Sequence, residues 1–157
     1  LLTGRADRVD LMADGSVRLI DYKTGKPPSE KQVRSLLSPQ LALETAMLVA
    51  GGFDRTGSTA FAGRPIAEIA YVHLAGGREG GSWQPRAVPS GDDGGPFELA
   101  AAALERLDDL VRHFRRAETG YPSRPRVAFE KARGGDYDHL ARVAEWAAGE
   151  AGEGGEA

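Results

Sequence analysis

The strongest constraint on the fold of this chain is a glycine turn between two segments of alternating polarity near the N-terminus. The turn is Ala13-Asp14-Gly15, and the flanking segments are residues 7–12 and 16–23. A three-residue loop with glycine in third position is a common hairpin connection, because glycine readily adopts the left-handed conformation needed there. The pattern therefore predicts an antiparallel hairpin in which Met12 pairs with Ser16.

The register set by this loop places seven side chains on one face of the hairpin, because side chains alternate between the two faces along a strand. The apolar ones lie nearer the turn and the ionisable ones at the open end: Val9, Leu11, Val17 and Leu19, then Asp7, Asp21 and Lys23. Asp10 and Arg18 are predicted to pair on the opposite face. Like charges directly opposite each other are destabilising, so the facing carboxylates of Asp7 and Asp21 indicate a bound cation.

The residues alone leave two other interpretations open. Asp21 and Lys23 are common residue types, and a solvated pair at the end of a strand would look the same. A two-residue Asp14-Gly15 loop would pair Asp7 with Tyr22 instead, which would move Asp7 to the other face of the hairpin.

Three motifs follow one another in the first third of the chain, at residues 4–10 (GRADRVD), 20–25 (IDYKTG) and 39–44 (PQLALE). Their order and spacing resemble the RecB-type branch of the PD-(D/E)xK nucleases, and most closely the C-terminal nuclease domain of the AddB family. Residues 121–125 and 135–143 also resemble the end of AddB-family proteins. The resemblance implies an α/β, restriction-endonuclease-like core, in which a small mixed β-sheet is flanked by helices.

The resemblance also implies a role for each matching residue. Asp7 and Asp21 would ligate Mg²⁺ or Mn²⁺ together with the backbone carbonyl of Tyr22, since hard cations prefer oxygen ligands. A cation of this kind lowers the pKa of a bound water. Lys23 would lie beside the attacking water and the scissile phosphate, where a fixed positive charge stabilises the transition state. Gln40 matches the Gln of the family's Q-x-x-x-Y motif.

The chain departs from the family pattern in three respects. Glu44 stands at the Tyr position of the Q-x-x-x-Y motif. In the family, a His or Glu on an earlier helix usually completes the metal site, and this chain begins inside its first predicted strand. Because its first residue is Leu1 and not Met, we expect an N-terminally truncated fragment of a longer protein. The chain has no Cys, so we expect no iron–sulfur cluster of the kind that many AddB proteins hold.

The apolar and turn patterns predict one domain, residues 1–148, followed by a disordered tail, residues 149–157. The tail is Gly-, Glu- and Ala-rich and cannot bury a core. A length of 157 residues with 41% hydrophobic content is enough for one core. After the hairpin, the predicted elements are a helical turn from residue 29, helices at about 38–50, 96–117 and 136–148, and strands at 66–74 and around Trp83.

Two helix starts carry local signals. Ser29 and Gln32 have the spacing of a capping box. Ser38-Pro39 is the predicted N-cap and first residue of the next helix, where proline is favoured. That helix carries Gln40 and Glu44 on one face, because they are four residues apart. If its N-terminus faces the Asp–Lys cluster, its free amides favour a phosphate there.

Charge and composition limit the classes of partner. The net charge of −3 is not that of a simple nucleic-acid binder, although basic residues gather late in the chain: Arg112, Arg115, Arg116, Arg124, Arg126, Lys131 and Arg133. Such a stretch fits contact with a DNA backbone as well as it fits ordinary solvated charges. No apolar run reaches the length of a membrane span, and no signal peptide is visible. We therefore expect a cytoplasmic protein with no membrane contact.

The resemblance implies a metal-dependent DNA exonuclease module of a helicase–nuclease complex, which processes double-strand break ends for recombination repair. Its partners would be an AddA-like helicase–nuclease subunit and a DNA single strand delivered by the helicase. No base-reading motif is present, so binding is expected to be to backbone phosphates and to depend on salt. The alternative is a catalytically incomplete nuclease fold that serves DNA binding or complex assembly. A third interpretation is another PD-(D/E)xK enzyme, either restriction-type or Cas4-like, and the lack of Cys counts against the latter.

Overall fold

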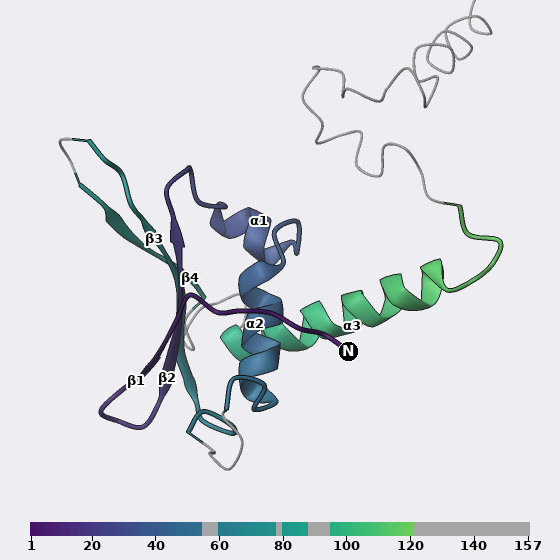
Figure 1. The fold of residues 1–157 in the computed structure, drawn as a ribbon, viewed down its shortest axis with the longest axis horizontal. Coiled ribbons are helices and arrows are strands. Elements are labelled where there is room, and N and C mark those ends of the chain that lie inside the picture. The colour runs from purple at the N-terminus through teal and green to yellow at the C-terminus, as the bar shows by residue number, and fades with distance from the viewer. Residues whose placement is uncertain (55–59, 78–79, 88–94, 121–157) are drawn as a thin grey trace, which may run out of the picture. The chain divides into compact units, whose positions relative to one another are not determined.

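The computed structural model describes residues 1–54, 60–77, 80–87 and 95–120. Within them, a four-stranded sheet has the order β1-β2-β3-β4 (Figure 1). The strands are β1 (Arg8–Leu11), β2 (Val17–Lys23), β3 (Ile66–His73) and β4 (Ser82–Ala87), and the helices are α1 (Glu30–Arg34), α2 (Gln40–Val49) and α3 (Pro96–Phe114). None of these helices has the length and apolar character that crossing a membrane requires.

The sheet is mixed. β1 and β2 form an antiparallel hairpin, β2 and β3 are parallel, and β3 and β4 are antiparallel. The parallel pair requires a long crossover between its strands, which here contains α1 and α2. Both helices and the N-terminal half of α3 lie on one side of the sheet (Figure 1). The predicted small mixed sheet with flanking helices is therefore confirmed.

The structure confirms the three-residue hairpin loop. The Met12 N–H donates to the Ser16 carbonyl at 2.8 Å, and Gly15 has a φ of 83°. The observed register pairs Val9 with Leu19, as predicted. The two-residue loop and its shifted register are therefore excluded.

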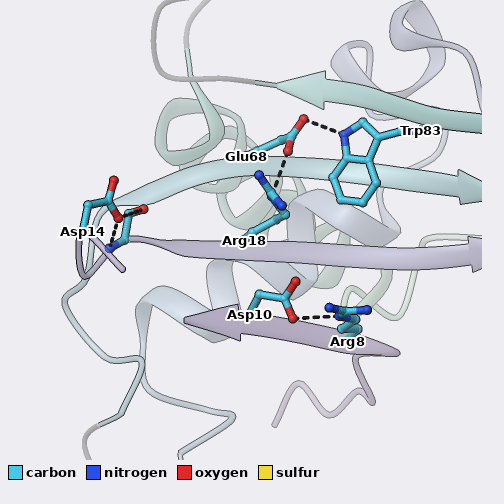
Figure 2. Close-up of polar contacts among 7 residues, drawn as sticks. Arg8, Asp10, Asp14, Arg18, Glu68 and Trp83 are labelled. Atoms are coloured by element: carbon cyan, nitrogen blue, oxygen red, sulfur yellow. Dashed lines mark hydrogen bonds and ion pairs between the residues drawn. The ribbon is translucent and has the colours of Figure 1, made fainter. Parts of the chain in front are cut away.

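The ion pair predicted between Asp10 and Arg18 is wrong, although the two residues are register partners. Asp10 instead accepts a hydrogen bond from Arg8 at 2.7 Å, and Arg18 pairs with Glu68 of β3 at 2.9 Å (Figure 2). The Arg18 guanidinium also lies 5.0 Å from the ring centroid of Trp83, whose indole N–H donates to Glu68. The parallel neighbour β3 supplies a better-placed carboxylate than the hairpin does.

The core lies between the sheet and the helices. Side chains from both layers are fully or almost fully buried there: Val17, Leu19, Ile69 and Tyr71 from the sheet, Leu41 and Leu48 from α2, and Leu99 and Ala103 from α3. Val17 and Leu19 belong to the face that the hairpin pattern marked as apolar. Asp21 follows them on the same face and is therefore drawn toward the interior.

One of the two predicted helix starts is confirmed and the other is wrong. Ser29 and Gln32 form the capping box of α1. α2 begins at Gln40 with Pro39 as N-cap, and no side chain caps it. The backbone N–H of Ser38 donates to the Gln32 carbonyl at 2.9 Å. Ser38 thereby belongs to the connection from α1. The predicted helix at 136–148 and the tail at 149–157 lie outside the described residues.

We predict that Gly15→Ala lowers the free energy of unfolding by about 1–2 kcal/mol, because an L-residue pays that amount in the left-handed region. Urea denaturation of the full chain measures this. Gly25→Ala is the matched control: Gly25 has no positive φ and a Cβ there meets open space, so the change should be within about 0.5 kcal/mol. Equal effects of the two variants would contradict the role assigned to the turn.

Candidate active site

Two of the predicted site residues lie at the C-terminal end of β2, on its helix-covered face. Asp21 is only 2% exposed, and Lys23 follows it two residues later on the same face. In the sheet, Asp21 is the register partner of Tyr71 on β3. An ionised carboxylate at such depth requires compensating partners.

Lys23 and Gln40 supply those partners. The Lys23 ammonium lies 2.8 Å from Asp21 Oδ2 and donates to Gln40 Oε1 at 3.0 Å. Gln40 Nε2 donates to Asp21 Oδ1 at 2.6 Å. The three side chains thus form a closed triangle, in which both oxygens of Asp21 are engaged. Gln40 is the first residue of α2, so the N-terminus of that helix lies at the site.

Asp7 approaches the same place from the chain segment just before β1. Its Oδ2 accepts a hydrogen bond from the backbone N–H of Tyr22 at 3.0 Å. The sheet pairing ends at Arg8 and Ile20, one position short of the predicted pairing of Asp7 with Asp21. The structure therefore brings Asp7 to the Asp21 segment through its side chain and not through strand pairing. Asp10 lies on the other face, as predicted.

Glu44 adds a carboxylate to the site. It lies one helical turn after Gln40 on α2, is 7% exposed, and accepts a hydrogen bond from Gln40 Nε2 at 3.1 Å. Its other oxygen, Oε2, is buried and has no hydrogen-bond partner among the described residues. Burial raises the pKa of Glu44, and so do the charges of Asp21 and Asp7, whereas the Gln40 hydrogen bond and Lys23 oppose the rise.

Tyr71 is a site neighbour that the sequence did not reveal. It is fully buried, and its ring centroid lies 5.6 Å from the Lys23 ammonium and 5.3 Å from the guanidinium of Arg86. Arg86, on β4, donates from Nε to the carbonyl of Pro28 at 2.7 Å. Both contacts depend on the order of the strands in the sheet, for which no local signal exists.

The donor chemistry of the site fits a hard divalent cation. Asp7, Asp21 and the Tyr22 carbonyl offer oxygen atoms, and Mg²⁺ is usually bound through one or two carboxylates and several waters. Among the described residues, no three acidic or histidine side chains lie close enough together to hold a metal. The carboxylates of Asp7, Asp21 and Glu44 nevertheless outnumber the single ammonium of Lys23, an imbalance that favours a cation.

An Asp-x-Lys pair at the end of a strand in a mixed sheet, joined to a helix N-terminus, defines a class of phosphodiester-cleaving domains. The chain belongs to the PD-(D/E)XK nuclease superfamily, whose family model matches residues 1–142. The superfamily implies a nuclease. No solved structure matches the chain significantly.

Its curated relatives are uncharacterized proteins of Rickettsia species. A 70-residue segment is 34% identical to part of a protein from Rickettsia conorii. The match covers 45% of this chain and 8% of that protein. Another is 36% identical over 81 residues to one from Rickettsia bellii, covering 46% of this chain and 10% of the relative. The matches thus span about a tenth or less of the relatives' own length.

We predict that Glu44→Gln raises the free energy of unfolding at neutral pH. A carboxyl whose pKa is raised in the folded state destabilises that state once the unfolded chain ionises. The excess in the free energy of unfolding of the variant over wild type should therefore grow as the pH rises above 4.5, the ordinary pKa of a Glu carboxyl, and vanish below it. Urea denaturation at several pH values measures this difference.

The control for this experiment is Glu105→Gln, at an exposed position of α3. The free energy of unfolding of this control should differ little from that of wild type at every pH. A pH-independent difference for Glu44→Gln would contradict the assignment of a desolvated carboxyl.

Proposed function

We propose that this chain is a divalent-metal-dependent DNA exonuclease module of a helicase–nuclease complex that processes double-strand break ends. The observation that carries the proposal is the triangle of Asp21, Lys23 and Gln40, with Asp7 beside it. A buried carboxylate and a fixed ammonium on the same strand end provide the two charges that phosphodiester hydrolysis needs: one to hold a cation and one to face the phosphate.

In the proposed reaction, Asp7 and Asp21 would hold Mg²⁺ or Mn²⁺ with the Tyr22 carbonyl. The bound cation would supply an acidified water and neutralise charge on the phosphate. Lys23, fixed by two acceptors, would present its remaining N–H to the water or to a phosphate oxygen. Gln40 would keep Lys23 and Asp21 in place.

The N-terminus of α2 supports phosphate as the ligand. Gln40 is its first residue, and no acidic side chain lies in the first turn of the helix. Free backbone N–H groups and the helix dipole at such an end favour an anion. Contacts of this kind are made to the backbone and not to the bases, in agreement with an exonuclease that accepts any sequence.

The assignment to a helicase–nuclease complex rests on the motif resemblance to the AddB family. The small share of the Rickettsia relatives that is matched supports a module within a larger protein. A single DNA strand delivered by an AddA-like helicase subunit would be the substrate, and the cytoplasm would be the location.

A catalytically incomplete fold that binds DNA or assembles the complex is the second candidate function. It is favoured by the lack of a three-ligand acidic cluster among the described residues. Cleavage of single-stranded DNA by the full-length protein with Mg²⁺ or Mn²⁺ decides between the two. Binding without cleavage would select the second candidate.

We predict that Asp21→Asn in the full-length protein abolishes metal-dependent DNA cleavage, because the neutral amide cannot hold the cation. Calorimetric titration should show a matching loss of Mn²⁺ affinity. Asp10→Asn is the matched control, since Asp10 lies on the opposite face and pairs with Arg8. Full cleavage by the Asp21 variant would refute the metal assignment.

We predict that Lys23→Ala lowers kcat for DNA cleavage by about 10²–10³-fold and leaves KM for DNA nearly unchanged. The reason is that a preorganised charge acts mainly on the charge that develops in the transition state. Steady-state kinetics with a labelled single strand measure both constants. A rise in KM with constant kcat would make Lys23 a simple phosphate contact.

A further inference from the structure

The side-chain amide of Gln40 is held by a different partner at each of its polar positions. Nε2 donates to Asp21 Oδ1 at 2.6 Å and to Glu44 Oε1 at 3.1 Å, and Oε1 accepts from Lys23 at 3.0 Å. An amide has two N–H donors and one carbonyl acceptor, so these contacts use both donors. Turned by 180°, the amide would direct its oxygen toward two carboxylates and its N–H groups toward an ammonium. Only one orientation satisfies all three partners.

Glu44 is the second buried acceptor that supports that orientation, beside Asp21. Gln40 itself is exposed, so water competes for its amide, whereas Glu44 is 7% exposed and lies one turn deeper along the same helix face. Asp21 Oδ1 accepts from one of the two N–H groups, and the other N–H needs a second acceptor. Without Glu44, one Nε2–H would lose its acceptor, and only Asp21 and Lys23 would hold the amide, so the amide would rotate more readily.

The orientation of the amide decides what Lys23 contacts. The ammonium has three N–H donors. It donates one to Gln40 Oε1 and forms an ion pair with Asp21 Oδ2, and donor capacity remains for a ligand. A rotated amide would present N–H groups to the ammonium and repel it. The presence of the Glu44 acceptor thus affects the contacts of Lys23 through the orientation of the Gln40 amide, although no direct contact joins Glu44 to Lys23 in the described structure.

We propose that Glu44, at the position where the family motif has Tyr, is a positioning residue that fixes the Gln40 amide and thereby directs Lys23. The proposal deepens the proposed function, because Lys23 is the group that would face the phosphate. The contact itself exists without DNA or metal, and it is therefore testable without activity.

The test compares two variants of the full chain. Glu44→Gln keeps an oxygen acceptor at this position, and Glu44→Leu removes it while filling the buried space with an apolar side chain of similar size. NMR spectra of the side-chain amides and of the lysine ammonium groups report on Gln40 and Lys23 directly. Gln40→Glu and Lys23→Arg identify the two signals by their disappearance.

In Glu44→Leu, we expect hydrogen exchange of the Gln40 amide to accelerate by about tenfold, the factor of one net hydrogen bond. We also expect the Lys23 ammonium signal to broaden, and Glu44→Gln to retain both signals. The backbone amide spectrum and Tm verify the fold of each variant; if the Leu variant does not fold, Glu44→Met replaces it. Unchanged Gln40 and Lys23 signals in the folded apolar variant would overturn the proposal, as would equal changes in Glu44→Gln.

Kinetics of the full-length protein separate this proposal from the proposed function. The positioning role predicts a lower kcat for Glu44→Leu with little change in KM for DNA, and near-normal values for Glu44→Gln. Lost activity with unchanged NMR signals would overturn the positioning role. If the NMR signals change as expected and the wild type cleaves no DNA, the positioning contact is supported and the nuclease proposal fails.

Discussion

The carboxylate of Asp21 is the constraint on which the rest of the site depends. Asp21 is 2% exposed and lies at the end of an otherwise apolar strand face, where an unpaired charge would be very costly. Lys23 on the same strand and Gln40 on α2 compensate it, one by charge and one by hydrogen bonding. The second contact fixes how the start of α2 lies against β2. The group that we propose as a metal ligand thereby also determines the local packing.

Polar side chains form separate groups on the two faces of the sheet. The outer face carries the network of Arg18, Glu68 and Trp83, which links three neighbouring strands (Figure 2). The side chains of Arg18 and Glu68 are 30% and 12% exposed, and an ion pair that is partly open to solvent adds only modest stability by itself. Together they favour one register between β2 and β3. That register places Tyr71 beside Asp21 on the inner face.

The departure from the family motif at position 44 alters the electrostatics of the site. A buried carboxylate stands there, and its pKa is raised by burial and by the charges of Asp21 and Asp7. Gln40 connects this carboxylate to Lys23 through one amide. Glu44 therefore still interacts with the rest of the motif, because it accepts a hydrogen bond from Gln40.

The sequence by itself determined the hairpin, its register and the candidate residues Asp7, Asp21, Lys23 and Gln40. The hairpin and the shared face of Asp21 and Lys23 depend on local rules: a glycine with positive φ and the two-residue period of a strand. Gln40 was a candidate through the motif resemblance, and the strand pairing ends one position before Asp7. The choice of ion partner for Arg18, the approach of Asp7 through the Tyr22 N–H and the place of Tyr71 and Arg86 at the site were decided only by the tertiary structure. Each depends on which strands become neighbours, and that choice follows from the packing of the whole core and not from any local segment.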